Sequence, residues 1–130
     1  MSEPLLASLA VGFGAFAGAN VRYVIGLAWD RYVTHPFPGH TLFINVSGSF
    51  LLALIVGLLG ERYQTAHPFR LLLTVGFCGG FTTFSTFAVE TVNLMRAGDN
   101  TQALLYIIAS VGLSILAAVA GLWLAGRLVA

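Results

Sequence analysis

The residues whose types and spacing could bind ions gather in one short stretch, residues 76–87. Gly76, Gly79 and Gly80 weaken a helix there, because glycine loses the most backbone entropy on folding. Hydroxyl side chains follow at positions 82, 83, 85 and 86, between phenylalanines at 81, 84 and 87. Freed carbonyl oxygens at a helix break can bind a cation, and hydroxyl groups can donate to an anion. We expect a helix break with an ion site beside it.

The composition places this stretch inside a membrane. The 130 residues are 58% hydrophobic and 8% charged, whereas a soluble domain has about 25% charged residues. Apolar runs at residues 5–29, 41–60, 69–95 and 101–130 are long enough for transmembrane helices. We therefore predict an all-α, multi-pass protein of the cell (plasma or inner) membrane, with residues 1–130 forming a single integral membrane domain. The expected break falls near the bilayer midplane, where non-helical backbone needs cover from protein or access to water and ions.

Polar side chains recur at helical spacing in three of these runs. They are Thr41, Asn45 and Ser49 in the second run, Thr83, Thr86 and Glu90 in the third, and Tyr106, Ser110 and Ser114 in the fourth. Residues spaced by three or four positions share one face of a helix. Interhelical hydrogen bonding and the lining of an ion pathway both explain each stripe. Together the stripes favour a polar track, and Glu90 is an intramembrane carboxylate that indicates a functional site.

The first run carries two features of a different kind. Gly14 and Gly18 form a GxxxG pattern, which predicts close packing against another helix. Arg22 follows at the same spacing and has two interpretations. It snorkels to the lipid headgroups, or it attracts anions at a vestibule.

Neither catalysis nor nucleic-acid binding has support in this sequence. The net charge of +1 provides no basic surface for nucleic acid. His35, His40 and His67 fall in the connections between the apolar runs, where we expect solvated side chains outside the polar track. They lack metal-ligand spacing, and no catalytic triad, CxxC or phosphate-loop pattern accompanies them. We predict that the protein is not an enzyme.

The arginines predict how the chain inserts. Arg62, Arg70 and Arg127 are expected on the side of both termini, and Arg22, Arg31 and Arg96 on the opposite side. Because an excess of Lys and Arg normally sets orientation, this balance predicts insertion both ways round. Two opposed copies would form an antiparallel homodimer, with the broken helices meeting at a cation on the two-fold axis.

Three motifs resemble those of the Fluc (CrcB) fluoride channels. Residues 14–23 (GAFAGANVRY) resemble the family pattern GAxxGAxxRY, and residues 41–50 (TLFINVSGSF) resemble TLxxNxxGSF. Residues 76–87 (GFCGGFTTFSTF) match GFxGGxTTFSTF almost throughout, with Glu90 and Thr91 in register. His40 is a departure, since the family usually has Gly-Thr directly where this chain has Gly39-His40-Thr41.

The resemblance implies a fluoride channel that exports fluoride passively through two antiparallel pores of a dual-topology homodimer. It implies a structural sodium ion at the dimer interface, held by the carbonyls of Gly79 and Thr82 from both subunits. Phe84 and Phe87 would line the pore, with Asn45 donating to fluoride. The remaining pathway residues would be Thr41, Thr83, Thr86, Glu90, Tyr106, Ser110, Ser114 and, at a vestibule, Arg22.

Two other functions compete with this one. A small proton-coupled multidrug exporter would need a carboxylate central to its binding site, whereas Glu90 lies toward the end of its run. A membrane subunit without transport activity would use the polar stripes only to join helices.

Overall fold

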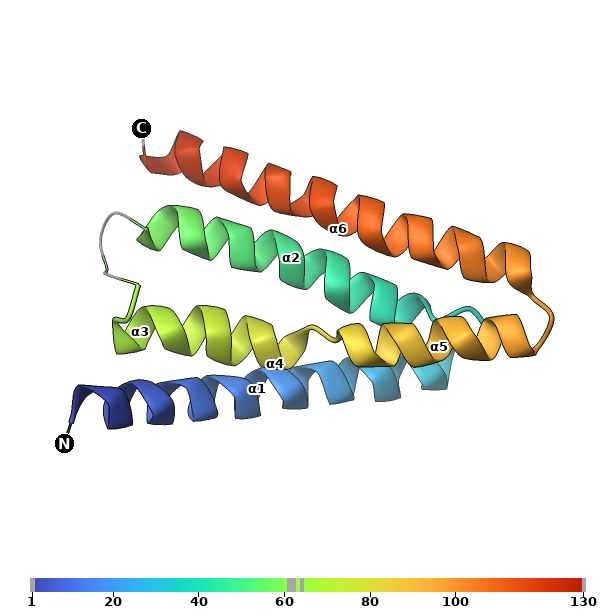
Figure 1. Ribbon diagram of the computed structural model, residues 1–130, viewed down its shortest axis with the longest axis horizontal. Coiled ribbons are helices and arrows are strands. Elements are labelled where there is room, and N and C mark those ends of the chain that lie inside the picture. The colour runs from blue at the N-terminus through green and yellow to red at the C-terminus, as the bar shows by residue number, and fades with distance from the viewer. Residues whose placement is uncertain (1, 61–62, 64, 130) are drawn as a thin grey trace.

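Within the part of the chain that the structure describes, the fold is a bundle of four helices, each long and apolar enough to cross a membrane. The computed structural model describes residues 2–60, 63 and 65–129. Helix α1 spans Glu3–Tyr32, α2 spans Gly39–Leu59, a segmented third helix spans Pro68–Arg96, and α6 spans Asn100–Val129. They run side by side, with the start of α1 and the end of α6 at the same end of the bundle (Figure 1). The predicted all-α architecture is confirmed. Arg62 and Ala130, which entered the predicted charge count and fourth run, lie outside the described residues.

The third helix is broken, as expected, but at a different point. It begins as α3 (Pro68–Leu71), continues as a π-helical segment η1 (Leu72–Cys78) and as α4 (Gly79–Phe81), and resumes as α5 (Phe84–Arg96). Only Thr82 and Thr83 between α4 and α5 are extended, with ψ angles of 160° and 116°. The expectation that the glycines themselves break the helix was wrong, because all three are helical.

The glycines bring two helices into close contact instead. Gly14 and Gly18 of α1 face the backbone of the third helix, and a β-carbon on either would collide with a backbone carbonyl there. Gly76 and Gly80 face the backbone of α1 in the same way, at Val11 and Ala15. The prediction of tight packing at the GxxxG pattern is confirmed, and it explains why these glycines are tolerated inside helices.

Helices α2 and α6 form a second close pair along their lengths. Gly57 of α2 faces Ala125, and Gly121 of α6 faces the backbone near Phe50. This pair and the α1 pair pack on each other and position the break of the third helix beside α2 (Figure 1).

Candidate functional site

Asn45 of α2 holds the break of the third helix in place. Its Oδ1 accepts from the amide of Thr83 at 2.8 Å, and its Nδ2 donates to the carbonyl of Thr83 at 2.9 Å. Thr83 in turn begins α5, because its Oγ1 accepts from the amide of Thr86 at 3.2 Å and donates to that residue's hydroxyl at 3.0 Å. A side chain on one helix thus satisfies both backbone groups of the residue at the centre of the break.

The break redirects amides that a continuous helix would use elsewhere. A regular helix would direct the amide of Thr83 to the carbonyl of Gly79, and that of Thr86 to the carbonyl of Thr82. Both amides bond to side chains instead. The Gly79 and Thr82 carbonyls, the two predicted cation ligands, therefore lose their helical donors. Gly79 is exposed, with open space where a side chain would begin.

Arg22 of α1 reaches the same break from the other side. Its Nε donates to the carbonyl of Gly80 at 3.2 Å, a carbonyl that a continuous helix would pair with the amide of Phe84. The side chain of Arg22 therefore contacts the backbone of the third helix, and the choice between snorkelling and an anion-attracting vestibule stays a prediction. Arg31 and Arg96 lie in the last turns of α1 and α5.

An open groove of about 340 Å³ runs beside the break. The predicted pathway residues that line it are Asn45, Thr83, Phe84, Phe87, Ser110 and Ser114. The two phenylalanine rings lie 5.5 Å apart, yet Phe84 is 78% exposed and Phe87 only 8%. The hydroxyl of Ser110 is buried without a hydrogen-bond partner among the described residues. The groove thus combines amide and hydroxyl groups with an aromatic wall.

A second cluster forms around the carboxylate of Glu90. The hydroxyl of Thr41 donates to its Oε1 at 2.9 Å, and the hydroxyl of Tyr106 donates to its Oε2 at 2.7 Å. Thr41 and Tyr106 are almost completely buried. The ring of Tyr106 lies 5.1 Å from that of Phe87, which connects this cluster with the groove. The predicted track is therefore divided into two neighbouring polar clusters.

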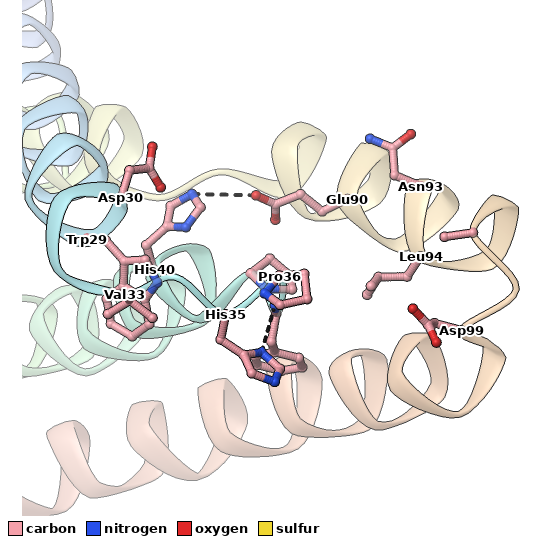
Figure 2. A pocket seen from close by; sticks show the side chains of 13 residues that line it. Trp29, Asp30, Val33, His35, Pro36, His40, Glu90, Asn93, Leu94 and Asp99 are labelled. Carbon is pink, nitrogen blue, oxygen red and sulfur yellow. Dashed lines mark hydrogen bonds and ion pairs between the residues drawn. The ribbon is translucent and has the colours of Figure 1, made fainter.

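His40 also belongs to the Glu90 cluster, and its assignment to a solvated connection was wrong. It lies in the first turn of α2, and its Nε2 is 3.5 Å from Glu90 Oε1 (Figure 2). Both side chains line a cavity of about 410 Å³ at the end of the bundle. A smaller cavity of about 210 Å³ joins His40 to Arg22, Thr83 and Thr86. The interruption of the Gly-Thr pattern was the sequence signal for this residue.

The two clusters are suited to a small anion more than to covalent chemistry. Hydroxyl and amide groups can replace part of an anion's hydration shell. Phenylalanine edges carry the positive part of the ring quadrupole and can face an anion. Backbone carbonyls at the break present oxygen ligands, which hard cations prefer.

Comparison with known proteins also indicates an ion-transporting membrane protein. The family model described as CrcB-like protein, Camphor Resistance (CrcB), matches residues 9–122. A protein of Nitrobacter winogradskyi named fluoride-specific ion channel FluC is 42% identical over 114 residues, covering 88% of this chain and 90% of the relative. A protein of the same name from Magnetococcus marinus is 42% identical over 119 residues, covering 92% of this chain and 96% of the relative. With the helices, the three motifs and these matches in agreement, the chain belongs to the CrcB family.

Proposed function

We propose that this protein is a fluoride-specific ion channel that lets fluoride leave the cell passively. The observation that carries the proposal is the open groove beside the helix break, which is lined by Asn45, Phe84, Phe87, Ser110 and Ser114. The relatives with this name, about 40% identical over most of the chain, supply the identity of the anion. Their names describe ion channels, which supports a function other than catalysis.

The groove offers hydrogen-bond donors for which the described residues provide no acceptor. An amide NH₂ group has two donors, and Asn45 directs one of them to Thr83. The second is available to an anion in the groove. Ser110 adds a buried hydroxyl without a partner among the described residues. A dehydrated fluoride ion would find here part of the hydrogen bonding that it loses on leaving water.

A second copy of the chain would complete the site. A groove open to hydrocarbon would expose Asn45, Thr83 and Ser114 to lipid, where unsatisfied polar groups are unfavourable by several kcal/mol. Phe84, at 78% exposed, is also positioned to meet a partner. We propose an antiparallel homodimer, which the equal number of arginines expected on the two sides of the membrane, three on each, supports.

A structural sodium ion fits the break in this dimer. The carbonyls of Gly79 and Thr82 have lost their helical donors, and Gly79 is exposed. Carbonyl oxygens are suitable ligands for a hard cation. The same residues of both copies would hold the ion, which would supply positive charge to join the two broken helices. Replacing sodium by a large organic cation should weaken the dimer in detergent, and an unchanged dimer would contradict the assignment.

Reconstitution into liposomes tests the function. Liposomes loaded with fluoride should release it once an ionophore for potassium balances the charge, while liposomes loaded with chloride should keep their contents. Absence of fluoride release from folded protein would refute the proposal, as would equal release of chloride.

Labelling tests the orientation. The native Cys78 is buried, so Ser2→Cys supplies the accessible thiol. An impermeant maleimide should label part of this population from each face of the membrane. Labelling from one face alone would contradict the antiparallel arrangement.

A further inference from the structure

His40 occupies a position in which its protonation would change the electrostatics of the predicted pathway. It is the residue next to Thr41, whose hydroxyl donates to Glu90, and its own Nε2 lies 3.5 Å from the same oxygen. His40 is 25% exposed and Glu90 19% exposed at the side chain, so both remain in contact with solvent at the cavity. Histidine is the side chain whose charge ordinarily changes near neutral pH.

The position of His40 is fixed by its neighbours. The ring of Trp29 fills the space that a side chain on Gly39 would need, and it lies 6.4 Å from the imidazole ring. Figure 2 shows His40 between Asp30 of α1 and Glu90 of α5, with its ring directed to the latter. The side chain of His40 therefore lies in the cavity of about 410 Å³, next to Glu90.

Three carboxylates, those of Asp30, Glu90 and Asp99, are among the ionisable groups around this ring. The ionisable groups that line the same cavities or contact Glu90 are Arg22, Tyr23 and Asp30 of α1, His35 before α2, Glu90 of α5, Asp99 before α6, and Tyr106 of α6. The guanidinium of Arg22 is directed to the carbonyl of Gly80. Of the described side chains, His40 is thus the group placed to supply a positive charge directly to Glu90.

We propose that His40 is a proton-dependent control residue for anion passage, an inference that rests on the proposed function. With His40 neutral, the Glu90 carboxylate repels an incoming anion and occupies the hydroxyls of Thr41 and Tyr106. A proton taken from water converts the ring to imidazolium, which offsets the carboxylate charge and competes for its oxygens. The two hydroxyls then become available to the anion. Fluoride passage is therefore greater when His40 carries the proton, and it increases toward lower pH.

Fluoride efflux at two pH values tests this inference. With equal pH on both sides, wild-type efflux at about pH 5.5 should exceed that at about pH 7.5 by about threefold or more. Protein-free liposomes at each pH measure the leak of neutral hydrogen fluoride, which is subtracted. In His40→Gln and in Glu90→Gln the ratio should fall to about one, because each removes one partner of the pair.

His67 provides a matched control. It lies at the opposite end of the bundle, where its Nδ1 accepts from the amide of Phe69, and His67→Asn keeps an acceptor at this helix start. This variant should retain the wild-type pH ratio. Fluoride efflux with the same pH ratio in wild type and His40→Gln would overturn the inference while leaving the proposed function intact. No efflux at either pH would refute the proposed function and the inference with it.

Fluorescence gives a second readout that does not depend on transport. In a Trp123→Phe background, Trp29 is the remaining tryptophan and lies beside His40. Protonated imidazole quenches indole emission on close approach, so the emission should decrease as the pH falls. The decrease should disappear in His40→Gln. An unchanged titration in that variant would show that His40 is not the group that takes up the proton.

Discussion

The substitution Asn45→Asp tests the role of the groove with the smallest change in shape. One side-chain oxygen can still accept from the amide of Thr83, so the bond at 2.8 Å is kept. The other oxygen replaces the nitrogen that donates to the carbonyl of Thr83 at 2.9 Å. That bond is lost, and a negative charge enters the groove.

The two effects act on different properties, stability and flux. Loss of this bond leaves the Thr83 carbonyl without its donor and lowers stability by about 1–3 kcal/mol, a part of the total stability of a folded domain. A carboxylate about 4 Å from the path repels fluoride by about 1–4 kcal/mol, depending on the local dielectric constant. That repulsion corresponds to a decrease in flux of about fivefold to several hundredfold. The variant should therefore fold and assemble but conduct poorly.

Fluoride efflux, normalised to the folded protein measured by size-exclusion chromatography, is the assay. Asn20→Asp is the matched control, because Asn20 lies on the exposed face of α1 and bonds to Phe16 of its own helix. It introduces the same charge away from the groove. Efflux by folded Asn45→Asp within about twofold of wild type would refute the reasoning that this groove carries the anion.

Three further predictions concern the aromatic wall, the helix packing and the carboxylate. Phe84→Ile should lower fluoride efflux without changing the chain's own packing, because Phe84 is exposed. Phe87→Ile should lower efflux and also destabilise the buried core by about 1 kcal/mol in thermal unfolding. Unchanged efflux in both variants would remove these residues from the path. Gly18→Ala should destabilise the fold by about 1–3 kcal/mol or more, because the added methyl group meets the backbone of the third helix. Gly12→Ala on the same helix meets open space and should leave stability unchanged. Equal unfolding temperatures of the two variants would contradict the close packing of α1 on the third helix. Glu90→Gln should retain fluoride transport that is not coupled to proton movement. Complete loss of transport in this variant, together with proton-coupled transport in wild type, would favour an exporter.

The sequence was sufficient for the helices because their signal is local. An apolar run of about 20 residues predicts a membrane-crossing helix by its length alone, and residues 41–60 correspond closely to α2 at Gly39–Leu59. The GxxxG pattern likewise predicted close packing at Gly14 and Gly18 correctly. Helical spacing also identified Thr41 and Glu90, which form a hydrogen bond, and Asn45, which bonds to Thr83.

The sequence was insufficient where contacts between helices decide the outcome. Intrinsic propensity placed the break at the glycines, but close packing on α1 keeps Gly76 and Gly80 helical. The break lies at Thr83 because Asn45, distant in sequence, satisfies its backbone groups. The partner of Arg22 could not be predicted for the same reason, since the carbonyl of Gly80 becomes available to it only when the third helix is broken. His40 joined Glu90 because α2 begins earlier than expected.

The ion selectivity of single channels tests the central claim most directly. Current through the purified protein in a planar bilayer should be measured with fluoride on one side and chloride on the other. The proposed channel predicts a steady current with a reversal potential set by the fluoride gradient. A reversal potential set by chloride or by protons, or the absence of current from folded protein, would contradict it.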